Sequence, residues 1–229
     1  TKHASLQPLE ELFDLDFVLD ETNDPAIFGR YGRRDVDACR YWMRGDVVAG
    51  LCARASGITS TNWLNKPEWA DLEVLLLGEN NFTDLVIPAG MTKLQHLDLN
   101  ASPDLTSVRF AGSPPRLRRL EATDCPDLST FVVPTDCPDL HYFDLNGCAL
   151  TSFALDGDFS SLVYLDLTKS PKLQAFSLAG NFASLLSLHL RTAAQLATLE
   201  IDTPLPALDT LDLAHCPILK PIPQDTTTT

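Results

Sequence analysis

LQHLDLNAS at residues 94–102 and LVYLDLTKS at residues 162–170 show the pattern that decides the fold. Leucines stand at the first, fourth and sixth positions, and an aspartate separates the fourth from the sixth. Alternation of this kind has the period of a short strand with one buried face. Related nine-residue segments open at Leu72, Leu117, Leu140, Leu185 and Leu208.

The spacing of these segments shows that they are repeats. Successive openings lie 22 or 23 residues apart, and a degenerate copy, VAGLCARAS, begins at Val48. A unit this short cannot bury its apolar face alone, so neighbouring units must stack and join their strands into a parallel sheet. The sequence therefore predicts a solenoid over residues 48–222.

These segments resemble the leucine-rich repeat family, whose signature is LxxLxLxx(N/C)xL. The resemblance covers about three quarters of the chain. It implies an α/β-type, mostly β, right-handed superhelix of about eight units of 22–24 residues, with its parallel sheet on the concave side. Unrelated functions share this fold, so the resemblance implies protein recognition only by analogy.

A second apolar pattern, LxxFxL, recurs in the other half of each unit. Its pairs include Phe131/Val133, Phe153/Leu155 and Phe176/Leu178. These halves are short and rich in residues that favour strands, so we expect an extended, strand-like convex side instead of helices. Phe131, Phe153 and Phe176 should stack as an internal spine.

The ninth residue of each unit is small, and in three units it is Cys125, Cys148 or Cys216. We interpret these cysteines as core residues that bond to backbone groups. A Cys125–Cys148 cross-link between adjacent rungs is the alternative. The absence of closely paired cysteines favours a reducing cytoplasm, while the threonine-rich tail leaves a secreted or cell-surface location open.

Residues 1–47 do not match the repeat and should form a small, partly helical N-terminal cap. Apolar residues between Leu6 and Val18 have roughly helical spacing, and Asp35 could cap a short helix through Tyr41 and Trp42. The arginines of this region either pair with its acidic residues or bind an anion. They are Arg30, Arg33, Arg34, Arg40 and Arg44.

Two further features have a structural and a functional interpretation. Arg44-Gly45-Asp46 spells an adhesion tripeptide, but its position predicts a turn into the first rung. Residues 223–229 should be a disordered, threonine-rich tail. Before it, Pro221 and Pro223 either blunt the last strand or precede a continuation of the chain, which we favour.

Charge excludes several classes of partner. The 17 basic and 31 acidic residues give a net charge of −14, which repels nucleic acid and anionic lipid. No apolar run approaches the roughly 20 residues of a membrane span. We therefore expect neither a nucleic-acid partner nor insertion into a membrane.

The third, fifth and seventh residues of each unit should face the concave side, where acids follow one another beside two tyrosines. This stripe would suit a basic protein or peptide. The competing interpretation is that the acids serve only solubility and edge protection. The predicted binding residues are His96, Asp98, Asn100, Arg119, Glu121, Tyr142, Asp144, Asn146, Tyr164, Asp166, His189, Arg191 and Asp212.

The sequence offers little for catalysis. No motif pairs a nucleophile with a base, and no loop is built to hold a phosphate. Stacked carboxylates do not converge as calcium ligands do, so we expect no metal and no cofactor. We predict a non-enzymatic binding module. The alternative is the ligand-sensing part of a larger multidomain signalling or NTPase protein whose catalytic module lies outside this chain.

Overall fold

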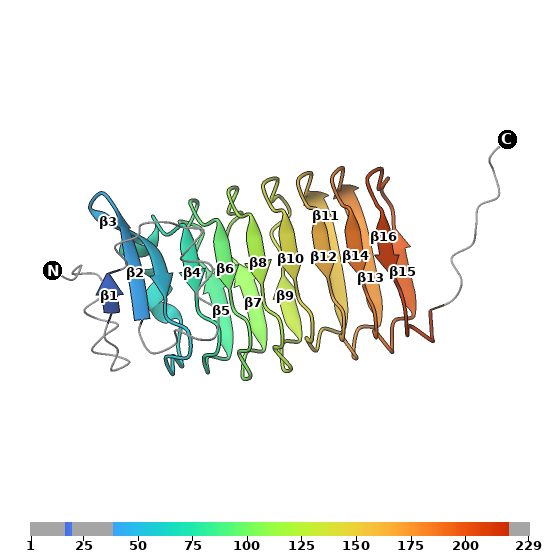
Figure 1. Ribbon diagram of the computed structural model, residues 1–229, viewed down its shortest axis with the longest axis horizontal. Helices are drawn as coiled ribbons and strands as arrows, with labels where there is room; N and C mark the ends of the chain where they lie inside the picture. The colour runs from blue at the N-terminus through green and yellow to red at the C-terminus, as the bar shows by residue number, and fades with distance from the viewer. Residues whose placement is uncertain (1–16, 20–38, 220–229) are drawn as a thin grey trace.

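The computed structural model describes residues 17–19 and 39–219. Its rungs lie side by side in a nearly straight row from β1 to β16 (Figure 1). The predicted helical stretch between Leu6 and Val18 is described only at its end, where Phe17–Leu19 forms strand β1, so the prediction of a helix is wrong there. The Asp35 cap, the pairing of Arg30, Arg33 and Arg34, and the tail at 223–229 lie outside the described residues. No helix among the described residues is long and apolar enough to cross a bilayer.

One side of the row is a ten-stranded sheet. Its order is β1-β2-β3-β4-β6-β8-β10-β12-β14-β16, and neighbours are parallel except for β2 and β3. The strands are β1 (Phe17–Leu19), β2 (Cys39–Arg44), β3 (Val47–Cys52), β4 (Val74–Leu76), β6 (His96–Asp98), β8 (Arg119–Glu121), β10 (Tyr142–Asp144), β12 (Tyr164–Asp166), β14 (Ser187–His189) and β16 (Thr210–Asp212). The structure thus has about seven full turns, and β3 occupies the place of the degenerate first unit.

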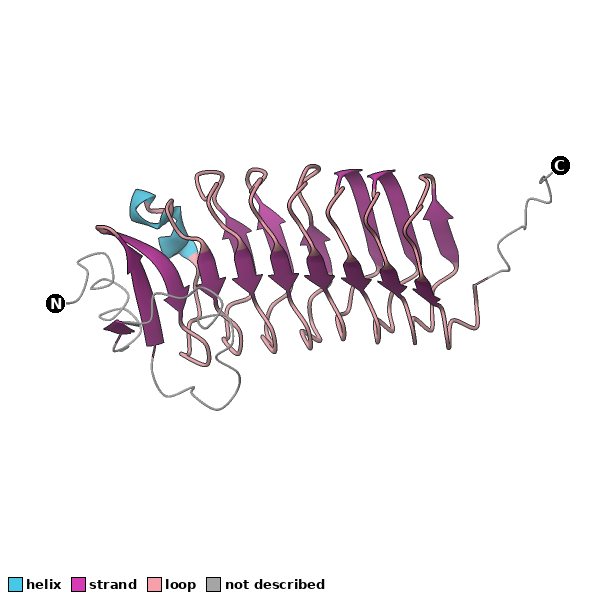
Figure 2. Ribbon diagram, turned by 45° about the horizontal axis from the view of Figure 1, so that its top comes forward, coloured by secondary structure: helices cyan, strands magenta, loops and turns pink. Residues whose placement is uncertain are grey.

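The opposite side also consists of strands, in two separate three-stranded parallel sheets. One contains β5 (Asp84–Ile87), β7 (Ser107–Phe110) and β9 (Thr130–Val132), and the other β11 (Ser152–Asp158), β13 (Ala175–Asn181) and β15 (Thr198–Ile201). Between the two sheets, a β-bridge joins Asp136 to Asp158. The predicted strand-like side is confirmed. Helical turns occur only near the N-terminal end, as η2 (Asn62–Asn65) and η3 (Pro67–Trp69), among the residues described (Figure 2).

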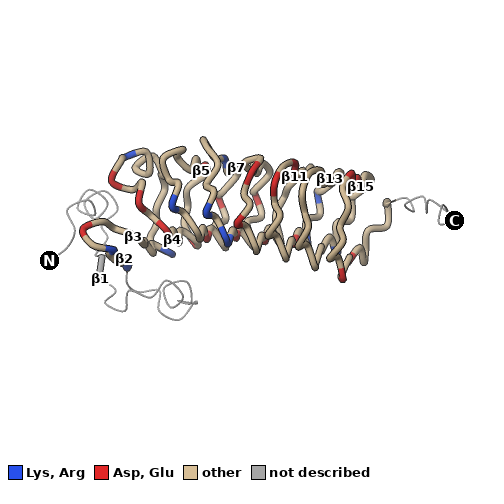
Figure 3. Tube along the Cα trace, turned by 90° about the horizontal axis from the view of Figure 1, so that it is seen from above, with Lys and Arg blue, Asp and Glu red and all other residues tan. Residues whose placement is uncertain are grey.

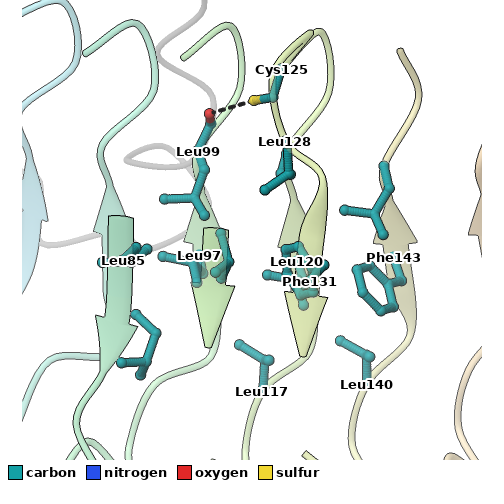
Figure 4. Packing of buried hydrophobic residues seen from close by; sticks show 14 of the residues in the cluster. Leu85, Leu97, Leu99, Leu117, Leu120, Cys125, Leu128, Phe131, Leu140 and Phe143 are labelled. Carbon is teal, nitrogen blue, oxygen red and sulfur yellow. Dashed lines mark hydrogen bonds between the residues drawn. The ribbon is translucent and has the colours of Figure 1, made fainter. Parts of the chain in front are cut away.

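The leucines of the repeat form a core that continues from rung to rung (Figure 4). Leu97, Leu120 and Phe143 occupy the fourth position of successive rungs, and all are fully buried. Because each rung covers the apolar side chains of its neighbour, the core needs no second layer of helices.

The predicted phenylalanine spine is present in part. Phe153 and Phe176 stack across β11 and β13, with ring centroids 6.2 Å apart. Phe131 reaches them only through Phe143 of the long sheet, whose ring lies 5.5 Å from Phe131 and 5.6 Å from Phe153. The direct stack is interrupted there because β9 and β11 belong to different sheets.

The prediction of a helix through Tyr41 and Trp42 is wrong, because both residues lie in β2. β2 pairs with β3 in antiparallel register, which places Trp42 opposite Gly50. The side chains of Tyr41 and Trp42 are buried on opposite faces of the sheet, and such alternation suits a strand. Gly45, with φ of 62°, lies in the turn between the two strands, so the predicted turn is confirmed.

Each rung turns at its eighth residue in the same way. Every one of these residues has a left-handed backbone, with φ between 49° and 77°. They are Ala55, Glu79, Ala101, Asp124, Gly147, Lys169, Thr192 and His215. Only one of them is glycine, so the turn is imposed by the stacking of the rungs and not by local preference.

The ninth-position cysteines are free thiols that bond to the preceding rung. Cys148 Sγ donates to the carbonyl of Ala122 at 3.0 Å, and Cys125 Sγ donates to that of Leu99 at 3.4 Å (Figure 4). Burial raises the pKa of the Cys125 thiol to about 11, so it remains a neutral donor. The interpretation of these cysteines as core residues is therefore confirmed.

The two ends of the core differ. Leu211 in β16 occupies the place that Leu188 holds in β14, yet it is 38% exposed where Leu188 is 0% exposed. Among the described residues, no strand follows β16 in the sheet, which accounts for the greater exposure of Leu211.

Candidate functional site

The strand register brings the predicted binding residues into columns on one side of the long sheet. The third residues of neighbouring rungs face each other, and so do the fifth residues, as Tyr142 and Asp144 do with Tyr164 and Asp166. We call this side the outer face. It carries His96, Asp98, Arg119, Glu121, Tyr142, Asp144, Tyr164, Asp166, Ser187, His189, Thr210 and Asp212 on strands β6 to β16.

The aspartates of this face have a local structural role. Each accepts a hydrogen bond from the backbone N–H two residues later, as the chain leaves the strand. The distances are 2.9 Å from Asp98 to Asn100, 3.0 Å from Asp144 to Asn146, 2.6 Å from Asp166 to Thr168 and 3.0 Å from Asp212 to Ala214. The frequent LDL sequence thus reflects turn formation as well as any binding role.

Near the N-terminal end, the acids of the outer face pair with cations of this chain. Arg54 Nη1 lies 2.5 Å from Asp98 Oδ2, and Arg54 Nη2 lies 3.1 Å from Glu79 Oε1. Burial raises the pKa of Asp98 and outweighs the opposing effect of Arg54. The sequence analysis did not include Arg54, although it occupies the seventh position of the degenerate first unit.

Glu121 is the most strongly compensated acid of the face. Arg119 donates two hydrogen bonds to it, at 2.7 and 2.8 Å, and His96 Nε2 lies 3.0 Å from Glu121 Oε2. Burial alone would raise the pKa of Glu121, but these contacts lower it to about 2. His96 is therefore engaged by Glu121.

Tyr142 and Tyr164 form a rigid pair in the C-terminal half of the outer face. Their rings are stacked with centroids 4.8 Å apart and planes 5° apart. The Arg119 guanidinium lies 4.1 Å from the centroid of Tyr142, and the His189 ring lies 5.3 Å from that of Tyr164. Tyr142 therefore has a neighbour on each face of its ring, whereas Tyr164 is stacked on one face and has the tilted His189 ring on its other side.

The tyrosine hydroxyls donate to the neighbouring carboxylates. Tyr142 Oη lies 2.9 Å from Asp144 Oδ2, and Tyr164 Oη lies 2.7 Å from Asp166 Oδ2. Burial, together with the aspartates, raises the pKa of both tyrosines, so they remain neutral donors. Burial also raises the pKa of Asp144, and the charge of Asp166 adds to this shift.

The N-terminal end of the outer face is apolar, which the sequence analysis missed. Trp42, Ala49, Cys52, Val74 and Leu76 form a small buried cluster there. The Trp42 indole lies so close over Gly50 that a Cβ at this glycine would be 2.8 Å from the ring. The sequence did contain an indication of this patch. Among the seven rungs from β4 to β16, only the rung of β4 has apolar residues at both its third and its fifth position, Val74 and Leu76.

The remaining predicted residues lie around the strand ends. Asn100 Oδ1 accepts a hydrogen bond from the backbone N–H of Thr123 at 2.7 Å, which gives it a structural role. Asn146 follows β10, and Arg191 follows β14 with an exposed side chain. No group of three His, Cys, Asp or Glu side chains suited to a metal ion occurs among the described residues.

The fold and the site together define a β-solenoid repeat protein with a polar outer face. No family model matches the chain. A curated relative, the Roc-COR-CHAT protease from an unknown prokaryotic organism, is 30% identical over 210 residues, which cover 92% of this chain and 20% of that protein. The chain therefore spans about a fifth of the length of this relative.

Among solved structures, the chain is similar to one described as the functional domain of InlJ from Listeria monocytogenes, which includes a cysteine ladder. The two are 14% identical, and the match covers 92% of this chain and 49% of the other with a TM-score of 0.27. Similarity at this level carries no argument about this chain.

Proposed function

We propose that this chain is a leucine-rich-repeat segment of a larger multidomain protein, and that it binds another protein through its outer face. The repeat pattern and the solenoid support the first part. The similarity to a fifth of a much longer relative supports a place within a larger polypeptide.

The stacked pair Tyr142 and Tyr164 is the observation that carries the binding proposal. Tyrosines of this kind are frequent anchors at interfaces, because they bring a large contact area at a small cost in conformational entropy. Here Arg119 and His189 hold the rings from both sides, so little further ordering is needed on binding.

We also propose that the chain itself performs no catalysis. His96 is engaged by Glu121, and the outer face is a strand surface whose acids are held by internal hydrogen bonds. Any reaction of a larger protein, such as the one that gives the Roc-COR-CHAT protease its name, would belong to other segments. The free, buried thiols support a reducing compartment.

The test compares two matched double variants in capture from extracts of the source cells. Tyr142→Ala with Tyr164→Ala removes the anchor from the outer face. Val86→Ala with Val132→Ala removes exposed apolar surface from β5 and β9 on the opposite side. We expect the wild type and the valine variant to capture the same protein, identified by mass spectrometry, and the tyrosine variant to lose it.

Circular dichroism and thermal unfolding must first show that both variants keep the native fold. Capture that survives the tyrosine changes but is lost with the valine changes would move the binding site to the other side. Capture unchanged in both, or absent with the wild type, would contradict recognition through these residues.

A further inference from the structure

We infer that the opening between β9 and β11 binds an uncharged, extended peptide segment, which adds a strand to the edge of β11 and places one apolar side chain on Phe131 and Phe153. This opening lies on the side opposite the long sheet, where the strands from β5 to β15 form a flank of their own (Figure 3). The site is separate from the outer face, and the inference does not depend on the function proposed above.

The opening exists because two strands of consecutive rungs are not paired. β9 and β11 belong to different sheets. Their chains are nevertheless joined at both ends. The Ala149 N–H donates to the Leu128 carbonyl at 3.0 Å, and the Asp158 N–H donates to the Thr135 carbonyl at 3.2 Å. Between these two bonds lies a cavity of about 370 Å³, which we call the slot. It is lined by residues 129–133 and 151–154.

The side chain of Phe143 accounts for the separation of the two strands. The fourth residue of the unit is leucine in all other units, so Phe143 is the largest side chain in this column. Its ring lies 5.5 Å from that of Phe131 and 5.6 Å from that of Phe153. Because this ring stands between the two phenylalanines, β9 and β11 do not approach each other as paired strands do.

The edge of β11 presents unpaired backbone groups to the slot. Backbone groups of a strand point alternately toward its two neighbours. The Thr151 carbonyl accepts a hydrogen bond from Gln174 of the following rung, so the N–H and C=O groups of Ser152 and Ala154 point toward the slot. Within the described chain, no backbone hydrogen bond joins these two residues to β9. An extended segment laid along this edge would satisfy both of them.

The lining of the slot selects for an uncharged segment. Phe131 and Phe153 are 9% and 4% exposed and form its apolar floor, while Thr130 and Ser152 bring hydroxyl groups to its rim. None of the nine lining residues is charged. A charged side chain would lose hydration there without gaining a counter-charge, whereas an apolar side chain would cover the two rings.

Titration of a neutral peptide into the isotope-labelled full chain, followed by amide chemical shifts, tests the inference. The probe is acetyl-Ser-Thr-Leu-Thr-Ser-amide, and two reference peptides each lack one of its properties. One carries N-methyl groups on its three central residues, which removes the donors that an added strand needs. The other has glycine in place of leucine, which removes the apolar anchor. We expect saturable shifts at the amides of Ser152 and Ala154, and about fivefold or more weaker binding of both reference peptides.

Ala154→Pro and Ala154→Val form a matched pair of protein variants. The two new side chains are similar in size, but proline removes the N–H that faces the slot. This N–H has no partner among the described residues, so the pairing of β11 with β13 should survive the change. We expect the valine variant to bind the probe within about twofold of the wild type, and the proline variant to bind it about fivefold to tenfold more weakly. If the proline variant loses its native circular dichroism, the leucine and N-methylated peptides compared on the wild type decide instead.

Four results would overturn the inference. The first is a wild type that shows no saturable shifts at millimolar peptide. The second is equal binding of the N-methylated peptide, because strand addition would then have no part in recognition. The third is a dimer in sedimentation velocity that Ala154→Pro dissociates, which would assign the slot to a second copy of this chain. The fourth is a response lost in Tyr142→Ala with Tyr164→Ala, which would place the peptide on the outer face.

Discussion

Arg54 and Asp98 lie 44 residues apart in the chain and form an ion pair of 2.5 Å that spans two repeat units, from the unit of β3 past that of β4 to that of β6. Asp98 is 5% exposed, and its Oδ1 is bonded to the N–H of Asn100. A buried carboxylate without its cation is costly, because neither water nor a partner compensates the charge.

Arg54→Met should therefore lower the free energy of unfolding by about 3 kcal/mol at neutral pH. Burial disfavours the ionised form of Asp98 and raises its pKa, and the charge of Arg54 opposes this effect. Arg54 therefore stabilises the ionised form of Asp98 and not the protonated one. The deficit of Arg54→Met should shrink as the pH falls and Asp98 becomes protonated in the folded state. Urea unfolding at pH 7 and pH 4 measures this. The explanation is refuted if Arg54→Met is as stable as the wild type, or if its loss of stability grows toward pH 4. As a control, adding Asp98→Asn to Arg54→Met should restore most of the lost free energy of unfolding.

The cost of replacing Glu121 should also shrink as the pH falls, but only below about pH 4.5. Contacts with His96 and Arg119 lower its pKa from 4.5 to about 2 in the folded protein. The stabilisation is therefore complete above pH 4.5 and is lost as the pH falls from there toward 2. Glu121→Gln should cost about 2 kcal/mol at pH 7, after allowance for the half-exposed Arg119, and almost nothing at pH 2. Denaturant titrations across this range decide, and a cost independent of pH would show that the charge is irrelevant.

Gly157 is required by a close approach of the backbone. Its φ is 133°, and a Cβ added there would lie 1.6 Å from the carbonyl oxygen of Thr135. Gly157→Ala should lower the free energy of unfolding by about 3 kcal/mol or more, because backbone must move. Gly90→Ala is the matched control, since a Cβ there meets nothing within 4 Å. Similar thermal midpoints for the two variants would contradict this assignment.

Lys169 is the eighth residue of its rung and adopts the left-handed backbone conformation that every rung has at this position. Its φ is 57°, which costs a residue with a Cβ about 1 kcal/mol relative to glycine. Lys169→Gly should therefore raise the free energy of unfolding by up to that amount. Lys172→Gly, three residues later and not left-handed, should lower it. Calorimetry of both variants checks the pair, and destabilisation by both changes would show that the turn carries no such cost.

Much of the fold could be predicted from the sequence because the same buried positions recur in every repeat unit. The period of 22–23 residues places Leu97 beside Leu120 and Asp144 beside Asp166. The strand-like second side followed from short apolar pairs such as Phe153/Leu155. The left-handed eighth position could not be predicted, because Glu79, Lys169 and Thr192 have no local preference for it; the neighbouring rungs impose it.

The cap and the charge compensation were harder to predict because both depend on contacts distant in sequence. Tyr41 and Trp42 lie in a strand because β3 pairs with them, and helical spacing in isolation carries no information about that partner. Asp98 looked like an unpaired member of an acidic stripe until the fold placed Arg54 beside it. Writing the degenerate first unit into the same columns would have revealed Arg54 at its seventh position.

The division of the second side into two sheets has a mechanical consequence. One flank of the molecule is a sheet hydrogen-bonded along its whole length, whereas the other is interrupted between β9 and β11, where a bridge joins Asp136 to Asp158. A rod built in this way is stiff toward stretching of the continuous flank and compliant at the interruption. Bending that opens the interrupted flank breaks few hydrogen bonds, so elastic deformation should concentrate in the middle of the solenoid, directly behind the strands that carry Glu121 and Asp144.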